Sequence, residues 1–200
     1  MTAPRLGIFG GTFDPPHLGH LLVAETAREE LALDQVLFML APQPPHKSVQ
    51  VLTPWPQRLA MLQNALSDHP QFIISTLEAQ RSGPSYTVDT LRALRKLPEF
   101  EHAQLYLLLG QDSMSNFHTW REPETIRQLA TVAIYPRHET HETAAPLSLP
   151  ANCLLLNAPI IAISSSEVRR RVARQQSIRY LVPENVREYI ATQRLYHQEA

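Results

Sequence analysis

Short apolar runs alternate along the chain with longer stretches in which apolar residues recur every three or four positions. The short runs predict strands at 6–9, 36–40, 72–77, 104–109, 132–135 and 154–156. The longer stretches predict helices at 18–31, after 54, and at 88–97, 167–174 and 183–193. Strands that alternate with amphipathic helices favour an α/β, Rossmann-like doubly wound parallel sheet. We expect one domain over 1–200 with a small C-terminal helical part from about 164.

The segments between these elements contain the breakers and polar residues typical of loops. Thr53 precedes two prolines and is expected to cap the helix that follows. The proline-rich segment 41–47 predicts a rigid loop, and the polar segment 138–150 predicts a surface loop. In parallel sheets ligands bind beyond the carboxyl ends of the strands, so residues that follow strands are the candidates for a site.

Composition narrows the class of protein. Hydrophobic residues make up 44% and charged residues 18% of the 200 positions, which disfavours disorder. The net charge of −1 disfavours broad nucleic-acid binding, and no apolar run approaches the roughly 20 residues that span a membrane. The single cysteine, Cys153, cannot form an internal disulfide, and its apolar neighbours predict a buried strand residue. Without a signal peptide in view, we expect a cytoplasmic protein.

The strongest chemical signal is the segment 10–20, GGTFDPPHLGH, between the first strand and the first helix. Gly10 and Gly11 let the backbone approach a phosphate, and the helix N-terminus favours an anion there. His17 and His20 are three positions apart and can face the same side, while Gly19 is expected to leave room for a nucleotide. The segment is neither the dinucleotide fingerprint nor a Walker loop, which disfavours an NAD-binding redox protein.

A second signal is the segment 163–169, ISSSEVR, before a C-terminal helix. Serines in this position are ordinary helix caps, but they also suit a second helix N-terminus directed at phosphates. In that case Ser165 and Ser166 would offer hydroxyls and Arg169 a positive charge. Because Arg169 is followed by two more arginines on a helix, only one of the three can face a given ligand.

These two segments resemble the signatures G-x-F-x-P-x-H-x-G-H and I-S-S-T-x-x-R of the nucleotidyltransferase superfamily. Ser166 stands where the second signature usually has threonine, which keeps the hydroxyl. Over essentially its whole length the chain is similar to bacterial nicotinate-nucleotide adenylyltransferases. The similarity includes the segments Pro45-His46-Lys47, Ser85-Tyr86-Thr87 and Gly110-Gln111-Asp112-Ser113, and Trp120.

The resemblance implies adenylyl transfer from ATP to nicotinate mononucleotide, which yields nicotinate adenine dinucleotide and pyrophosphate. It implies catalytic roles for His17, His20 and Arg169. It assigns ATP binding to Gly10, Gly11, Thr12, Phe13, His17, Gly19, His20, Gly110, Asp112, Ile163, Ser165, Ser166 and Arg169. Mg²⁺ would be carried by the ATP phosphates, since the sequence contains no obvious carboxylate cluster for a metal.

The resemblance also implies that the acceptor substrate is bound by Lys47, Ser85, Tyr86, Thr87, Trp120 and Arg137. Trp120 would stack on the pyridine ring, and the backbone N–H groups around Thr87 would hold the carboxylate. Ordinary explanations remain for three candidates: a solvated Lys47, Asp112 as a helix cap, and Trp120 in the core.

The acceptor is the least determined part of this interpretation. Nicotinamide mononucleotide or phosphopantetheine would use the same chemistry. Related phosphopantetheine adenylyltransferases and glycerol-phosphate cytidylyltransferases carry threonine at the position of His17, which favours the pyridine nucleotide. A nucleotide-binding module without catalysis is a further alternative. The sequence leaves open the acid or amide preference, the kinetic order and the oligomeric state, with which a homo-oligomer is compatible.

Overall fold

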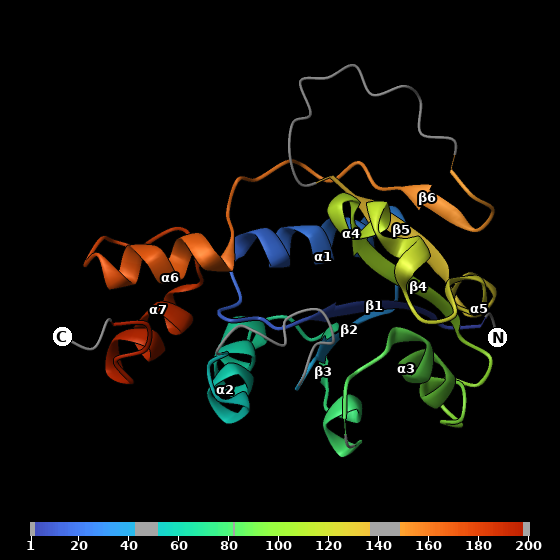
Figure 1. Ribbon diagram of the computed structural model, residues 1–200, viewed down its shortest axis with the longest axis horizontal. Coiled ribbons are helices and arrows are strands. Elements are labelled where there is room, and N and C mark those ends of the chain that lie inside the picture. The colour runs from blue at the N-terminus through green and yellow to red at the C-terminus, as the bar shows by residue number, and fades with distance from the viewer. Residues whose placement is uncertain (1–2, 43–51, 82, 137–148, 198–200) are drawn as a thin grey trace.

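The computed structural model describes residues 3–42, 52–81, 83–136 and 149–197. Its centre is a six-stranded parallel sheet in the order β3-β2-β1-β4-β5-β6 (Figure 1). The strands are β1 (Arg5–Gly11), β2 (Gln35–Leu40), β3 (Phe72–Ser75), β4 (Gln104–Gly110), β5 (Thr131–Tyr135) and β6 (Cys153–Leu155). The helices are α1 (Leu18–Glu30), α2 (Trp55–Leu66), α3 (Thr87–Leu94), α4 (Gln111–Ser115), α5 (Pro123–Leu129), α6 (Ser165–Ala173) and α7 (Glu184–Thr192).

The strand order places a topological switch point at the middle of the sheet. The chain runs outward from β1 through β2 to β3, returns to β4 beside β1, and then runs outward through β5 to β6. β1 and β4 pair in parallel from Arg5 opposite Gln104 to Ile8 opposite Leu107. In such sheets the crevice beyond the carboxyl ends of the two central strands is the usual ligand site. The predicted Rossmann-like fold class is confirmed.

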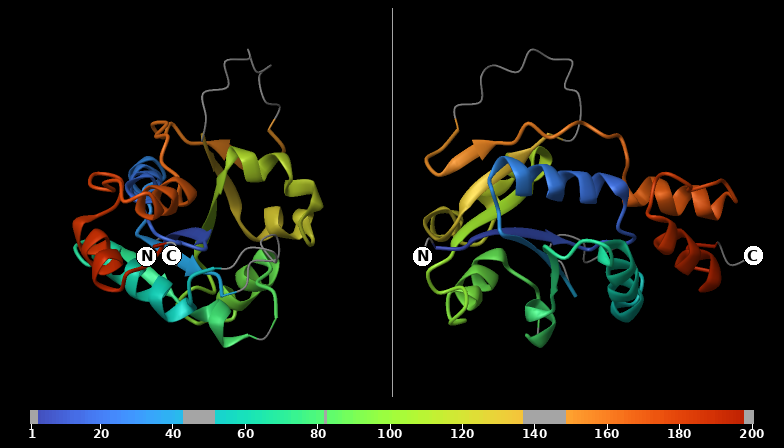
Figure 2. Two further views of the ribbon diagram at one scale, coloured as in Figure 1. Left: turned by 60° about the vertical axis from the view of Figure 1, so that its left-hand side comes forward. Right: turned by 180° about the vertical axis from the view of Figure 1, so that it is seen from behind.

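Helices bury the two faces of the sheet in separate hydrophobic clusters. Phe9 and Phe38 point to the face covered by α1, α2, α6 and α7, whereas Ile8 and Leu37 point to the face covered by α3 and α5. Successive side chains of a strand point to opposite faces, so burial on both sides explains why the strands are apolar runs without alternation. Figure 2 shows α6 and α7 at the end of the molecule next to α1 and α2.

Four local expectations differ from the structure. The third strand ends at Ser75, and a 3₁₀ turn follows at Leu77–Gln80. Pro54, not Thr53, is the N-cap of α2, and the backbone N–H of Thr53 donates instead to the carboxylate of Asp14 at 3.1 Å. Cys153 lies in a strand, as predicted, but is only half-buried. The short helices α4 and α5 and the 3₁₀ turn Phe117–Thr119 were not predicted, since so few residues show no helical period.

Two predicted loops fall largely outside the described residues. These are the segment 41–47, which contains Lys47, and the segment 138–150; Arg137 also lies outside the described residues. Within the described ranges, no helix is both long enough and apolar enough to cross a membrane.

Candidate active site

The turn between β1 and α1 opens onto a cleft of about 910 Å³. A Cβ atom on Gly10 would meet nothing within 4 Å, so the backbone there is open to a ligand. A Cβ atom on Gly11 would lie 2.9 Å from the ring of Phe13, so glycine is needed for that ring to pack. Phe13 has a φ of 45° and is 1% exposed. The buried ring of Phe13 thus fixes the turn, while the backbone at Gly10 stays open towards the cleft.

The two histidines of the turn form a stacked pair that lines the cleft. Their ring centroids are 3.6 Å apart, and His17 is the N-cap of α1. The backbone N–H of His17 donates to Nδ1 of His20 at 3.1 Å. An accepting Nδ1 means that the neutral His20 ring carries its proton on Nε2. His20 can therefore donate a hydrogen bond from Nε2, as an anion-binding role requires.

Gly19 lies against the ring of His17. It does not line the large cleft, and a Cβ atom on it would lie 3.1 Å from Nδ1 of His17. The missing side chain makes room for the imidazole of His17. A glycine at this position therefore suits the stacked pair of His17 and His20.

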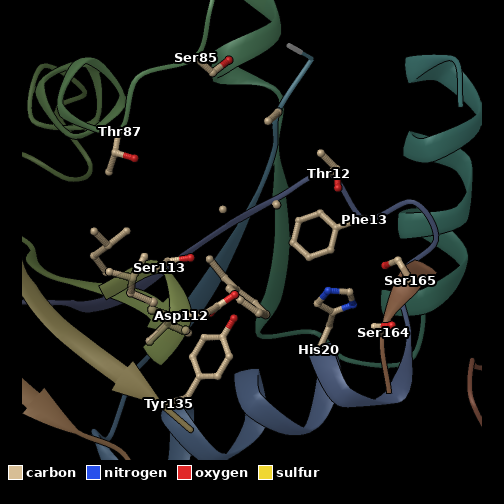
Figure 3. A pocket seen from close by; sticks show the side chains of 18 of the residues that line it. Thr12, Phe13, His20, Ser85, Thr87, Asp112, Ser113, Tyr135, Ser164 and Ser165 are labelled. Carbon is tan, nitrogen blue, oxygen red and sulfur yellow. The ribbon is translucent and has the colours of Figure 1, made fainter. Parts of the chain in front are cut away.

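The start of α6 meets the β1–α1 turn directly, although 150 positions separate the two segments. Ser164 caps α6 by accepting from the N–H of Glu167 at 3.1 Å. The hydroxyl of Ser165 donates to the carbonyl of Pro15 at 2.9 Å, and Nη1 of Arg169 donates to the carbonyl of Asp14 at 2.6 Å. In Figure 3, Ser164 and Ser165 stand beside His20. Two helix N-termini therefore border one cleft.

The three consecutive arginines of α6 take different directions, as their spacing predicts. Arg169 also donates to the hydroxyl of Ser166 at 3.3 Å, and both residues line the cleft. Arg170 pairs with Glu167, and Nε of Arg171 donates to a backbone carbonyl at 2.8 Å. One arginine thus reaches the site, and its neighbours stabilise the helix.

The opposite side of the cleft is formed by the start of α3 and the residues around Trp120. Ser85, Tyr86 and Thr87 line it, and Tyr86 is the N-cap of α3. Trp120 is half-buried and also lines the cleft. Its ring packs against that of Phe117, with 5.4 Å between the two ring centroids. Trp120 therefore both packs against the hydrophobic core and lines the cleft. An indole and a helix N-terminus suit a flat ring that carries an anionic group.

Most of the sequence-predicted residues line this cleft. The lining includes Gly10, Gly11, Thr12, Phe13, His17, His20, Ser85, Tyr86, Thr87, Gly110, Asp112, Trp120, Ile163, Ser165, Ser166 and Arg169. Gly110 is the N-cap of α4, so the alternative that Asp112 caps this helix is wrong. Gly19 is set back behind His17, and Lys47 and Arg137 lie outside the described residues.

Several residues that line the cleft were not predicted from the sequence, among them Tyr135, Glu78 and Arg121. Tyr135 ends β5, so the rule that ligands bind at carboxyl ends of strands could have found it. Glu78 is 8% exposed and accepts from the Thr90 hydroxyl at 2.7 Å. Burial raises the pKa of Glu78 above its ordinary value. Glu78 could not be predicted from the sequence, because the 3₁₀ turn that contains it has no recognisable motif.

A buried cation supports the turn from behind. Arg58 on α2 is 1% exposed, and its guanidinium donates at 2.8–3.2 Å to the backbone carbonyls of Thr53, Thr12, Ala41 and Pro42. Burial lowers the pKa of Arg58, and the charge of Asp14 opposes that effect. Because an arginine on an amphipathic helix is usually exposed, the sequence gives no warning of this role.

Among the residues that the structure describes, no three or more His, Cys, Asp and Glu side chains are grouped so that they could hold a metal ion. A cation that rides on a phosphate ligand would not need such a group.

Comparison with known proteins places the chain in a family. The family model described as cytidylyltransferase-like matches residues 8–171. Proteins named as probable nicotinate-nucleotide adenylyltransferases are 49% identical in Thermomicrobium roseum, over 96% of this chain and 91% of that protein, and 43% identical in Thermus thermophilus, over 96% and 99%. A solved Plasmodium falciparum nicotinic acid mononucleotide adenylyltransferase complexed with NaAD shares the fold, with a TM-score of 0.81, 21% identity and coverage of 96% and 97%. The chain therefore belongs to the cytidylyltransferase-like family and, within it, to the nicotinate-nucleotide adenylyltransferases.

Proposed function

We propose that this enzyme transfers the adenylyl group of ATP to nicotinate mononucleotide and releases nicotinate adenine dinucleotide and pyrophosphate. The observation that carries the proposal is the meeting of two helix N-termini, the histidine pair and Arg169 at one cleft. Names of relatives at 38–49% identity support the same acceptor. We call residues 10–20 with 163–169 the phosphate end of the cleft, and residues 85–87 with 119–121 its acceptor end.

The chemistry needs charge stabilisation and not a new nucleophile. A phosphate oxygen of the mononucleotide attacks the α-phosphorus of ATP in line. The bond from that phosphorus to the α–β bridging oxygen breaks, and the oxygen leaves with its electron pair in pyrophosphate. The attacking phosphate is already ionised near pH 7, so no base has to activate it. His17, His20 and Arg169 would instead stabilise the negative charge that spreads over the phosphoryl oxygens.

The remaining site residues divide between the two substrates. Asp112, at the carboxyl end of β4, would hold ribose hydroxyls of ATP, and Ser166 would help to hold the leaving phosphates. Trp120 would stack on the pyridine ring, while N–H groups at Thr87 would receive its carboxylate. Lys47 and Arg137 remain proposed phosphate contacts. Mg²⁺ carried by the ATP phosphates would add positive charge. A cytoplasmic location would give the enzyme access to both nucleotides.

The direct test incubates the purified chain with ATP, Mg²⁺ and either nicotinate or nicotinamide mononucleotide, and measures the dinucleotide and pyrophosphate formed. We expect the acid to be the better acceptor by kcat/KM. Turnover of the amide or of phosphopantetheine alone would change the acceptor and keep the chemistry. Intact ATP binding without turnover of any acceptor would favour the binding module and refute the enzyme.

A further inference from the structure

Asp14 joins four distant segments of the chain beneath the phosphate end. It is 1% exposed. Its Oδ1 accepts from the hydroxyl of Tyr196 at 2.7 Å, and its Oδ2 accepts from the backbone N–H of Thr53 at 3.1 Å. Its backbone carbonyl accepts from Nη1 of Arg169 at 2.6 Å. Asp14 thus connects the glycine turn with three other segments by hydrogen bonds. These are the segment before α2, helix α6 and the chain beyond α7.

Tyr196 reaches this carboxylate from near the C-terminus, 182 positions away. Its hydroxyl also lies 3.6 Å from Sδ of Met61, and its ring packs against the cluster that contains α2 and α7. Burial and the negative charge of Asp14 raise the pKa of Tyr196, so its hydroxyl stays a donor through the working pH range. A charge-assisted bond between a phenol and a buried carboxylate is stronger than a neutral one.

A second tie joins the same two regions. The backbone N–H of Leu18, the first residue of α1, donates to the carbonyl of Leu181 at 2.9 Å. The first turn of α1 and the carboxylate of Asp14 are therefore both held by residues that follow α6. Figure 1 shows α6 and α7 together at the end of α1 where that helix begins.

From these contacts we infer that Tyr196 is a positioning residue, which acts through Asp14 to hold the guanidinium of Arg169 at the phosphate end. The Asp14 backbone can present its carbonyl to Arg169 only if the residue is fixed, and its side chain is fixed by Tyr196 and Thr53. The residues after α7 are thus part of the catalytic machinery's support and not a separate appendage. The inference rests on the proposed function, because it takes Arg169 as a ligand of the ATP phosphates.

The test is Tyr196→Phe in the full chain, alone and combined with Arg169→Ala. The single variant keeps the ring and removes the hydroxyl, so kcat should fall about tenfold, as for loss of one bond to a charged group. KM for the mononucleotide should stay within about twofold, since the acceptor end is untouched. In the Arg169→Ala background, adding Tyr196→Phe should lower kcat by less than about twofold, because the two residues act in series.

Two controls separate positioning from loss of stability. Val186→Ala removes packing from α7 at a residue with 0% exposure and leaves Asp14 alone, so kcat measured well below its melting temperature should match the wild type. Tyr180→Phe alters a tyrosine that is 79% exposed and should change neither kcat nor stability. If Val186→Ala lowers kcat as much as Tyr196→Phe, or if the effects of Tyr196→Phe and Arg169→Ala multiply, the inference is overturned.

A binding measurement tests the inference even if the Tyr196→Phe variant is too unstable for kinetics or the wild type shows no turnover. Asp14→Asn keeps the side-chain volume but can no longer accept from both Tyr196 and the Thr53 N–H. Calorimetry with a non-hydrolysable ATP analogue should show weaker binding in Asp14→Asn, and no further weakening when Arg169→Ala is added. Equal analogue binding by Asp14→Asn and the wild type would overturn the inference. A wild type that binds the analogue but turns over no acceptor would refute only the proposed function.

Discussion

The charged groups that support the phosphate end are buried, whereas the acceptor end combines exposed charged contacts with the buried hydrogen bond between Thr90 and Glu78. Arg58 and Asp14 are each 1% exposed and lie directly behind the glycine turn. At the acceptor end, the guanidinium of Arg121 lies 5.0 Å from the centre of the Tyr86 ring and 3.3 Å from Asp89, and its side chain is 52% exposed.

This difference matches what each end is proposed to bind. Exposed ion pairs contribute roughly 0–1 kcal/mol, while breaking a buried charge network costs about 3–5 kcal/mol. A triphosphate in its transition state needs donors that are already in place, since their reorganisation would add to the barrier. A flat acceptor ring needs a surface that can admit it and release the larger product. A rigid phosphate end and a more easily adjusted acceptor end would meet both needs.

The largest expected effect comes from Arg58. Arg58→Met leaves the carbonyls of Thr12, Ala41, Pro42 and Thr53 without their donor and Asp14 without a nearby cation. We expect the free energy of unfolding, measured with urea, to fall by about 3–5 kcal/mol. The matched control, Arg92→Met, removes an exposed pair with Glu122 and should leave the free energy of unfolding nearly unchanged. Similar losses in both variants would erase the contrast between the two ends.

His20→Ala is expected to have the next largest effect, on turnover. The variant removes the Nε2 donor, so kcat should fall by about 10²–10³-fold, the range seen when one transition-state donor is lost. Circular dichroism should show the fold retained. His102→Ala, at an exposed histidine before β4, is the control and should keep the wild-type rate. A His20→Ala rate within threefold of the wild type would contradict the proposed mechanism.

A smaller effect at the acceptor end is expected from Trp120. Trp120→Ala should raise KM for the mononucleotide by about three- to tenfold, in line with the contribution of a stacked aromatic pair. KM for ATP should change less, and Trp120→Phe should recover part of the loss. Steady-state kinetics with each substrate varied in turn would measure the split. Equal increases in both constants would assign Trp120 to packing against Phe117 alone.

The smallest expected effect concerns Glu78 and depends on pH. Its raised pKa means that the folded state favours the protonated form, so its contribution to stability is complete below the ordinary value of 4.5 and is lost as pH rises through the raised value. Glu78→Gln removes this loss and keeps an acceptor for Thr90. Relative to the wild type, the variant should gain roughly 1 kcal/mol at pH 8. The gain should shrink towards pH 4.5, and a gain independent of pH would exclude titration of Glu78 as its cause.

Local sequence determined the sheet, the helices that cover it and the two motifs. Strands buried on both faces must be apolar throughout, so the runs 36–40 and 104–109 could be read directly. Glycines that follow a strand and serines that precede a helix mark N-termini able to hold anions, which located residues 10–20 and 163–169. These signals depend only on neighbours in the chain, and for that reason the sequence alone sufficed.

Tertiary structure alone decided what stands behind the motifs. Arg58 could be buried only because four carbonyls from three segments converge on it, and Tyr196 could reach Asp14 only because α7 packs beside α2. The part played by Gly19 likewise depends on where the ring of His17 lies. Desolvation and hydrogen-bond satisfaction depend on partners distant in sequence, and no pattern of neighbouring residues records such partners.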